Sequence, residues 1–256
     1  MTEFIPIGKW LRADFDTLES TNDEAARLSN AESAFQQNII VTAHRQLKGR
    51  GRRGRSWIGL KGNLFMSLLM PMADIAIGAF SLISAIALLK TIKQLSPKSQ
   101  VLLKWPNDVL LYGGKVSGIL VESGANNQVI IGIGVNIAAA PKGTDVPYKT
   151  TCLKEHNIDC SREEFISLYL NHFDEMLAVY KSFGMSKIVE IWQYYGYGIG
   201  QKISVRLPQK EITGIFKGLA NDGTLLLQDD KEKIINIGAG EILNMPEIKG
   251  IYNEQV

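Results

Sequence analysis

The sequence changes character at YYGYGIG, residues 194–200, and this change constrains the fold more than any other feature. Upstream of it, apolar strands and helical segments are mixed, whereas downstream only short strands follow, separated by tight turns such as Asn221-Asp222-Gly223. The first pattern is typical of a domain of mixed strands and helices, and the second of a small barrel. The length of 256 residues fits one large domain and one small one. We therefore expect a large domain over residues 1–197 and a small β-barrel over residues 198–256.

Helices in the first part are marked by capping residues and apolar runs. Thr21 followed by Glu24 fits a capping box, and Ser161 followed by Glu164 fits another. Residues 75–89 form a charge-free run of fifteen residues, shorter than the roughly twenty that a membrane span needs, so a buried helix is expected. The expected helices span residues 21–34, 77–95, 161–183 and 188–195.

Strands are marked by β-branched and apolar runs that end at glycine, proline or asparagine. The Gly113-Gly114 pair separates two such runs and has the spacing of a β-hairpin turn. Residues 138–157 are rich in polar and turn-forming residues, which predicts a long surface loop. The expected strands of the first part span residues 38–44, 63–70, 101–105, 109–112, 115–122 and 128–137, and those of the second part span 201–207, 211–219, 224–228 and 233–242.

Positive charge is concentrated in one short segment. The chain has 28 Lys plus Arg and 26 Asp plus Glu, a formal net charge of +2, but seven of the cations and no acid lie between Val41 and Lys61. Outside that segment 21 cations face 26 acids, so the rest of the chain is mildly acidic. Most of the seven belong to KGRGRRGRSW, residues 48–57, which we call the basic loop.

The basic loop has four possible interpretations. Gly49, Gly51 and Gly54 have the spacing of a dinucleotide fingerprint, but no helical pattern follows them to hold a pyrophosphate. A nucleic-acid patch would neutralise phosphates, yet no aromatic residue stands between the arginines to stack on bases. Two interpretations remain possible. The segment could be a solvated charged loop, or it could be a loop that covers phosphates, in which glycines allow close approach and arginines bind anionic oxygens.

Cysteine content and the first residues indicate the compartment. Two cysteines cannot build a disulfide framework, and MTEFIPIGKW lacks the pattern of a secretion signal, so we expect a reducing cytoplasm. Cys152, His156 and Cys160 stand four residues apart, but three ligands leave a tetrahedral structural zinc one short. An ordinary loop is therefore expected there.

Five further segments stand in a fixed order along the chain. They are Ser20-Thr21-Asn22, Gln46 with GRGRRGRSW at residues 49–57, KWPND at 104–108, GGKVSGILVE at 113–122 and GIGVNI at 132–137. Together they resemble the motifs of the biotin protein ligases, and the resemblance covers nearly the whole chain. Its most specific part is KWPND followed by a lysine in a GKxxGILVE-like strand.

The resemblance implies an α+β catalytic domain, a mixed sheet with flanking helices similar to class II aminoacyl-tRNA synthetases, followed by a small SH3-like β-barrel. It also implies a reaction in two steps. Biotin and ATP, with Mg²⁺, give biotinyl-5′-AMP and pyrophosphate; a lysine of a biotin carboxyl carrier protein then takes the biotinyl group and AMP leaves.

The position of the first motif implies a subclass. Some members of the family carry an N-terminal DNA-binding domain, whereas Ser-Thr-Asn comes only twenty residues into this chain. We therefore expect the short class, a monomer or weak homodimer that takes neither DNA nor a membrane as partner.

The resemblance also implies roles for individual residues. Lys115 and Arg52 are the catalytic candidates, because a cation between the biotin carboxylate and the α-phosphate lowers their repulsion and loop closure excludes water from the adenylate. The biotin-binding residues implied are Ser20, Thr21, Asn22, Gln46, Arg50, Gly51, Arg52, Lys115 and Gly118. The ATP-binding residues implied are Gly49, Arg50, Arg52, Arg53, Arg55, Trp57, Lys104, Asn107, Lys115, Asn136 and Lys217, with Asn136 and Asp108 as ligands of Mg²⁺.

Some details of these roles stay open. Trp57 and Trp105 are also candidates for core packing. Lys48 stands where many members have a small residue, and Tyr195 lies near the position of an adenine-stacking tryptophan in some members. Two other functions also remain: a lipoate or octanoyl ligase of similar fold, and a nucleic-acid-binding module built on the basic loop.

Overall fold

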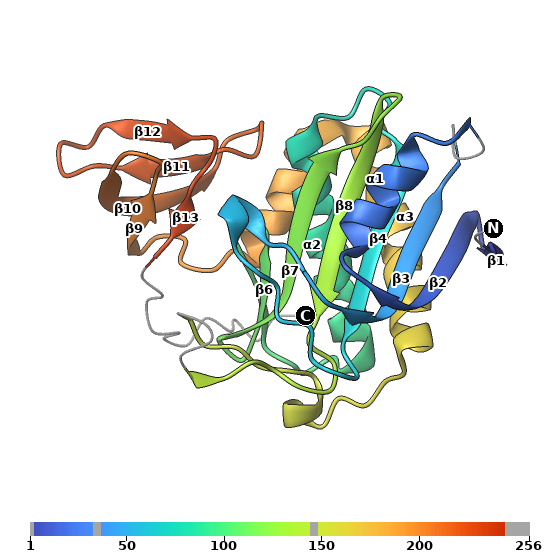
Figure 1. Ribbon diagram of the computed structural model, residues 1–256. Coiled ribbons are helices and arrows are strands. Elements are labelled where there is room, and N and C mark those ends of the chain that lie inside the picture. Colours follow the sequence, from blue (N-terminus) through green and yellow to red (C-terminus); the bar gives the residue numbers. More distant parts are fainter. Residues whose placement is uncertain (1–2, 33–36, 144–147, 244–256) are drawn as a thin grey trace.

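The structure, a computed structural model, describes residues 3–32, 37–143 and 148–243, and within these ranges the chain forms thirteen strands and three α-helices (Figure 1). The helices are α1 (Thr21–Ser29), α2 (Ile77–Leu95) and α3 (Arg162–Tyr194). The strands of the first part are β1 (Ile5–Ile7), β2 (Trp10–Leu18), β3 (Ile39–Gln46), β4 (Leu64–Pro71), β5 (Val101–Lys104), β6 (Asp108–Leu111), β7 (Gly114–Ser123) and β8 (Gln128–Val135). Those of the second part are β9 (Lys202–Arg206), β10 (Glu211–Leu219), β11 (Leu225–Gln228), β12 (Ile234–Ile237) and β13 (Glu241–Ile242).

The strands form two separate sheets. The larger has eight strands in the order β1-β2-β3-β4-β8-β7-β6-β5, and it is mixed because β2 and β3 run parallel while the other neighbours are antiparallel. The smaller has five antiparallel strands in the order β12-β11-β10-β9-β13. The α+β class and the small all-β unit predicted from the sequence are both confirmed, whereas the boundary at residue 197 stays a prediction.

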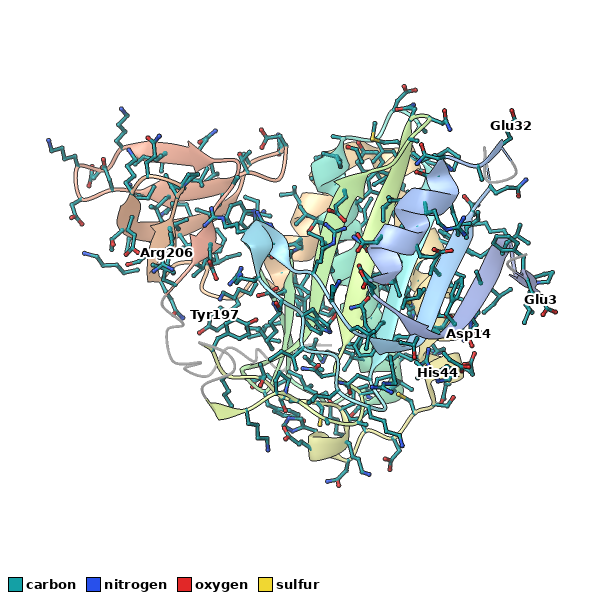
Figure 2. All side chains as sticks on the ribbon, in the orientation of Figure 1. Glu3, Asp14, Glu32, His44, Tyr197 and Arg206 are labelled. Carbon is teal, nitrogen blue, oxygen red and sulfur yellow. The ribbon has the colours of Figure 1, made fainter. Side chains whose placement is uncertain are left out.

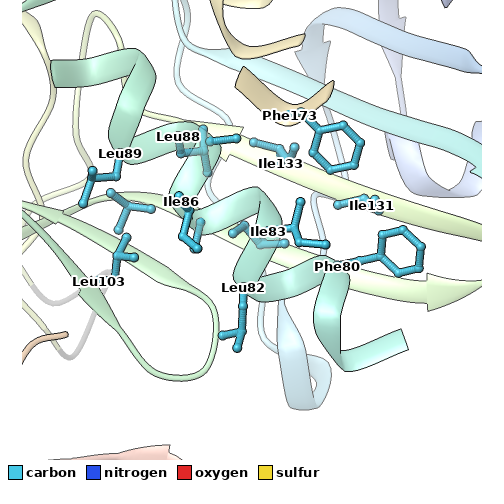
Figure 3. Close-up of a cluster of buried hydrophobic side chains, with 14 of the residues drawn as sticks. Phe80, Leu82, Ile83, Ile86, Leu88, Leu89, Leu103, Ile131, Ile133 and Phe173 are labelled. Atoms are coloured by element: carbon cyan, nitrogen blue, oxygen red, sulfur yellow. The ribbon is translucent and has the colours of Figure 1, made fainter. Parts of the chain in front are cut away.

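Helices cover both faces of the large sheet. α1 packs on β3, β4 and β8, while α2 and α3 pack together on the opposite face (Figure 1). α2 is apolar on nearly all sides because it lies between the sheet and α3, where Phe80, Ile83 and Ile86 meet Ile131, Ile133 and Phe173 (Figure 3). Of the described helices, α2 alone is long and apolar enough to cross a membrane, and most of it is buried inside the protein. It is a core helix, as expected.

Helix ends differ in part from prediction. Ser161 caps α3 as expected, since its hydroxyl accepts a hydrogen bond from the Glu164 N–H at 3.0 Å. Gly184, with φ of 72°, interrupts the helical backbone between the two predicted helices. The first capping box is wrong: Ser20 is the N-cap of α1, its side chain makes no capping hydrogen bond, and α1 ends at Ser29. Residues 33 and 34 of the predicted helix lie outside the described residues.

The sequence pattern does not predict β1 and β2. Charged residues interrupt the apolar alternation of β2, and Arg12 is nevertheless buried. The burial is possible because Arg12 pairs with Asp14 at 3.1 Å and with Glu163 at the start of α3. A buried charge needs a partner of opposite charge, and Glu163 lies 151 residues further along the chain than Arg12.

The small sheet joins the large one through a short buried junction. Backbone atoms of Tyr195 and Tyr197 hydrogen bond to Leu103 on edge strand β5 at 2.9 and 2.8 Å. Trp105 is buried beneath the small domain, and its indole N–H donates to the Gly223 carbonyl at 3.2 Å, which assigns it to core packing. Tyr197 lies at this junction and Arg206 lies on the small domain (Figure 2). The junction places the small domain beside the basic loop (Figure 1).

Candidate functional site

Two glycines on β8 open a hollow on the face of the sheet that carries α1. Residues alternate along a strand, so Ile131, Ile133 and Val135 enter the main core while Gly132 and Gly134 face the other side. A Cβ at Gly132 would collide with the side chain of Asn22, and a Cβ at Gly134 would collide with the Trp57 indole. Both glycines are therefore needed because side chains from other segments lie directly on the strand.

The floor of the hollow is a buried polar network. The Thr21 N–H and hydroxyl both donate to Gln46 Oε1, at 2.9 and 3.1 Å. The Ser67 hydroxyl lies 2.8 Å from Thr21 Oγ1 and 2.6 Å from Asn22 Oδ1. The Thr21 side chain is therefore part of the floor of the hollow and does not cap its helix. Such a set of hydroxyls and amides can present both donors and acceptors to a small polar ligand.

One wall is closed by an ion pair between the basic loop and β7. The Arg50 guanidinium donates to both carboxylate oxygens of Glu122, at 3.0 and 2.8 Å, and lies 2.8 Å from Asp23. The same Glu122 accepts a 2.7 Å hydrogen bond from the Asn22 amide. The basic loop is thereby joined to the polar floor.

Lys115 stands at the opposite end, on β7 immediately after the hairpin turn. Its Nζ lies 2.7 Å from Asp108 Oδ1, 5.5 Å from the centre of the Trp57 ring and 5.1 Å from that of Tyr148. Asp108 starts β6, the neighbouring strand, so the hairpin fixes both partners of this ion pair. A Cβ at Gly118 would lie 3.0 Å from Trp57 and 3.2 Å from Lys115 Nζ, which explains the glycine there.

Trp57 lies across the middle of the hollow. Its ring rests on the backbone of Gly134 and Gly118, and its indole N–H is buried without a hydrogen-bond partner. A buried donor that lacks a partner is costly, and such groups mark places where a ligand or water supplies the acceptor. Trp57 also lines a smaller space together with Tyr148, Asn136 and Thr150.

The basic loop folds back on itself and points its arginines at the site. The Gly51 N–H donates to the Arg55 carbonyl at 2.7 Å, and residues 52–54 form a single 3₁₀ turn. No α-helix follows Gly54, so the dinucleotide fingerprint is ruled out. Arg52 reaches Asn107 at 3.3 Å, and Arg55 pairs with Glu241 of the small domain. Burial and the charge of Arg53 lower the pKa of Arg52.

A cavity of about 600 Å³, including its open mouth, joins these features, and we call it the main cavity. It brings together every predicted biotin-binding residue. Those lining it are Ser20, Thr21, Asn22, Gln46, Arg50, Gly51, Arg52, Lys115 and Gly118. Of the other residues predicted to bind ATP, Arg55, Trp57 and Asn107 also line it.

The remaining predicted residues are distributed over neighbouring spaces. A second cavity, between the domains, is lined by Arg52, Arg53, Arg55, Lys104, Asn107, Asp108 and Glu241. A third, behind Trp57, is lined by Asn136 together with Lys115 and Tyr148. Gly49 allows the close approach of the Trp57 carbonyl. Lys217 is exposed on β10 and lines none of these three cavities, so the structure does not bring it to the site.

The two predicted Mg²⁺ ligands line different cavities. Asp108 lines the cavity between the domains, whereas Asn136 lines the one behind Trp57, where its Oδ1 accepts from Asn63 at 3.3 Å and its amide donates to the Thr151 carbonyl at 3.1 Å. Asn136 therefore connects Asn63 to the backbone of Thr151. Across the described residues, no three His, Cys, Asp or Glu side chains form a metal-binding group, Cys152, His156 and Cys160 included.

Several residues of the site are missing from the sequence prediction. They are Ser67, Glu122, Gly132, Gly134, Tyr148 and Glu241. Tyr195 does not line the main cavity, because its ring packs against Tyr194 and the core, whereas Tyr148 lines that cavity beside Lys115. The period-two spacing of Gly132 and Gly134 is the one signal in the sequence that could have placed them on the site face.

Comparison with known proteins identifies the family. The model of the Biotin/lipoate A/B protein ligase family matches residues 15–136, and that of the Biotin protein ligase C terminal domain matches residues 198–243. The biotin–[acetyl-CoA-carboxylase] ligase of Paracoccus denitrificans is 35% identical over 223 residues, which cover 82% of this chain and 91% of the relative. The chain belongs to the biotin protein ligases.

This biotin protein ligase is also similar to other members of the family, both in sequence and in structure. The bifunctional ligase/repressor BirA of Bacillus subtilis is 31% identical over 84% of this chain and 69% of its own length. In structure, the biotin protein ligase of Aquifex aeolicus, solved in complex with biotin and ATP, has a TM-score of 0.79 at 26% identity and covers 90% of this chain and 97% of that one. The similarity includes both sheets of this ligase.

Proposed function

We propose that this ligase converts biotin and ATP into biotinyl-5′-AMP and pyrophosphate in the main cavity, and then transfers the biotinyl group to a lysine of a biotin carboxyl carrier protein in the cytoplasm. The main cavity supports this proposal. It has an uncharged polar floor at one end and Lys115 at the other, with Arg50, Arg52 and Arg55 of the basic loop also lining it, which suits a molecule with a polar ring and a carboxylate tail.

The floor suits the ureido ring of biotin. That ring offers two N–H donors and one carbonyl acceptor, and the Thr21, Asn22 and Gln46 side chains supply matching groups within one network. A lipoyl ring has no N–H or carbonyl to pair with the remaining donor and acceptor positions of this network, so each hydrogen bond that it fails to make costs it about 0.5–1.5 kcal/mol of binding. The floor therefore favours biotin over lipoate as the acid.

The first step needs charge control more than proton transfer. An oxygen of the biotin carboxylate attacks the α-phosphorus of ATP, a bond to that phosphorus forms, and the bond to the β-phosphate oxygen breaks to release pyrophosphate. Lys115 stabilises the negative charge that accumulates at the α-phosphate, because its Nζ projects into the cavity beside Trp57. In the second step the acceptor amine attacks the carbonyl carbon, an amide forms, a proton is lost and AMP leaves.

The cavity between the domains is the proposed place of the β- and γ-phosphates. Arg52, Arg53, Arg55 and Lys104 line it, and arginine forks suit phosphate oxygens. Asp108 is the residue that would hold Mg²⁺ there, since Mg²⁺ is usually bound by one or two carboxylates plus substrate phosphates. When bound, the ion would neutralise charge on the leaving pyrophosphate.

The adenine ring is proposed to occupy the space behind Trp57. Trp57 and Tyr148 offer aromatic faces on which the ring could stack, and Asn136 offers polar atoms at the edge of the same space.

The arginines of the basic loop are partly paired with acids of this chain, which does not suit a free nucleic-acid patch.

Lys104 gives a test of the phosphate site. Lys104 is buried, and burial lowers its pKa, with the charge of Asp108 opposing the shift and that of Lys115 adding to it. Lys104→Met should raise the midpoint of thermal unfolding at pH 7 by about 2–4 °C, the shift that ~1 kcal/mol produces in a chain of this size. The same variant should have a KM for ATP about tenfold higher, the effect of losing ~1.4 kcal/mol of binding.

The pH dependence of that stability gain has a definite sign. Below the lowered pKa of Lys104 the wild type bears the full cost of a buried ammonium, and this cost falls as the pH rises toward the pKa of an unfolded lysine. The gain from methionine should therefore shrink in alkaline solution. A Lys104→Met protein that is less stable than wild type at pH 7 would contradict the phosphate-site role.

The acid specificity is tested by measuring pyrophosphate release with ATP, Mg²⁺ and one of three acids. We expect release with biotin, and none above background with lipoate or octanoate. Release with lipoate and not with biotin would reverse the assignment of the floor.

A further inference from the structure

We propose that Glu122 is a positioning residue that couples closure of the basic loop to the orientation of Asn22 on the floor of the main cavity. This inference rests on the proposed function, because it assigns Asn22 and the basic loop to biotin and its adenylate. Glu122 makes no contact that would place it at the reacting atoms, so its effect would pass through the two groups that it holds.

The carboxylate of Glu122 is shared between two segments. Its two oxygens accept from the two Nη atoms of Arg50, at 3.0 and 2.8 Å, in a fork-to-fork pair. Its Oε2 also accepts from Asn22 Nδ2 at 2.7 Å. Arg50 belongs to the basic loop and Asn22 to α1, so one carboxylate on β7 connects the cover of the cavity to its floor.

The position of Glu122 follows from strand alternation. Gly118, Leu120 and Glu122 project from the same face of β7, and in the pairing with β8 Leu120 stands opposite Gly132 while Glu122 stands opposite Ile130. β6 pairs with β7 only as far as Gly118, so Glu122 lies on the part of β7 that extends past β6. It is 30% exposed, within reach of both a loop and the interior.

Glu122 is the nearer of two acceptors that orient the Asn22 amide, at 2.7 Å against 3.5 Å for the Leu120 carbonyl. An ionised carboxylate only accepts hydrogen bonds, so the NH₂ group must point at Glu122, while Oδ1 accepts from Ser67 at 2.6 Å. The absence of a side chain at Gly132 lets the amide rest on the strand. With Glu122 and the Leu120 carbonyl accepting from the NH₂ group and Ser67 donating to Oδ1, the second lone pair of Oδ1 is left for an N–H group of the ligand.

The ion pair itself is too exposed to contribute much to folding. The Arg50 side chain is 42% exposed, and exposed ion pairs contribute little because water and salt screen them. Arg50 also has a second partner, Asp23 at 2.8 Å. Loss of Glu122 should therefore loosen the loop and free the Asn22 amide without unfolding the protein.

The test uses Glu122→Gln. Glutamine keeps the shape of glutamate, but only one of its two terminal atoms is an oxygen, so it cannot accept both hydrogen bonds of Arg50 and the bond of Asn22. We expect KM for biotin to rise about 5- to 10-fold with a smaller change in kcat, as for the loss of hydrogen bonds to a partly exposed charge. Without carrier protein, wild type should release about one equivalent of pyrophosphate per enzyme and stop, since the adenylate is retained. Glu122→Gln should continue to release pyrophosphate as adenylate escapes.

Two further variants separate this role from a structural one. Glu24→Gln is the matched control, because Glu24 also accepts two hydrogen bonds from one guanidinium, that of Arg27 on α1, and lines none of the three cavities; it should behave as wild type. Arg50→Gln should lose adenylate retention with a smaller effect on KM for biotin, and the double variant should retain adenylate no worse than either single variant. Glu122→Asp, which is too short to reach both partners, should fall between wild type and Glu122→Gln.

The outcomes distinguish this inference from the proposed function. Wild-type KM and full retention in Glu122→Gln, or additive losses in the double variant, would overturn the role of Glu122 while leaving the ligase function in place. If Glu122→Gln failed to fold, Glu122→Asp with wild-type KM and retention would overturn it equally. Wild-type protein that released no pyrophosphate with biotin would instead contradict the proposed function.

Discussion

Replacing Lys115 with alanine is expected to lower the rate of biotinyl-adenylate formation by about 100- to 1,000-fold, the loss seen when a single group that stabilises transition-state charge is removed. Lys115 is 12% exposed and its Nζ lies 2.7 Å from Asp108, so it is held on a rigid hairpin at the end of the main cavity. No other lysine lines that cavity, within the described part of the chain, to take its place.

The measurement is biotin-dependent pyrophosphate release under single-turnover conditions. Lys98→Ala, which removes an exposed lysine just after α2, is the matched control and should keep the wild-type rate. Lys115→Ala should also leave Asp108 without its cation, so Lys115→Arg is useful as a second variant that restores the charge. Pyrophosphate release by Lys115→Ala at the wild-type rate would contradict the assignment of Lys115.

Replacing Arg52 with glycine is expected to accelerate escape of biotinyl-adenylate by about 10- to 100-fold, the effect of removing a charged hydrogen bond to a phosphate. Arg52 is half-buried and lines both the main cavity and the cavity between the domains, where it contacts Asn107. Its removal would open a path between the two spaces and admit water to the adenylate.

Escape is measured by trapping free adenylate in solution after one round of pyrophosphate release. Arg52→Lys keeps a charge and should give an intermediate rate, while Arg27→Ala on α1 should retain adenylate like wild type. Equal escape from Arg52→Gly and from wild type would show that the arginine does not hold the intermediate.

Local sequence patterns predict most of the strands and helices, because strand alternation and apolar runs depend on neighbouring residues. Ser161 illustrates this, since its capping partner is three residues away. Thr21 has the same local pattern, but it does not cap its helix, because its hydroxyl donates to Gln46, 25 residues further along the chain. β2 was missed for the same reason: the partner that allows Arg12 to be buried is distant in the sequence.

In the candidate site, too, sequence motifs predict some residues, whereas others depend on partners that are distant in the sequence. The biotin-binding residues implied by the family motifs gather in one cavity, whereas most of the implied ATP-binding residues are divided among that cavity and two neighbouring ones, and their individual roles stay predictions. The acids that pair with the basic loop do not follow from any local pattern, since Glu122 is 72 residues from Arg50 and Glu241 is 186 residues from Arg55. The sequence shows a cluster of cations, and only the fold shows that acids of this chain hold several of them in place.

The most direct test of the whole account is transfer of biotin to a lysine of a purified biotin carboxyl carrier domain, followed by intact mass. With biotin, ATP and Mg²⁺, the wild-type protein should add one biotinyl group to wild-type carrier and none to carrier whose acceptor lysine is replaced by arginine. An unmodified carrier, or a carrier modified equally well without ATP, would contradict the account.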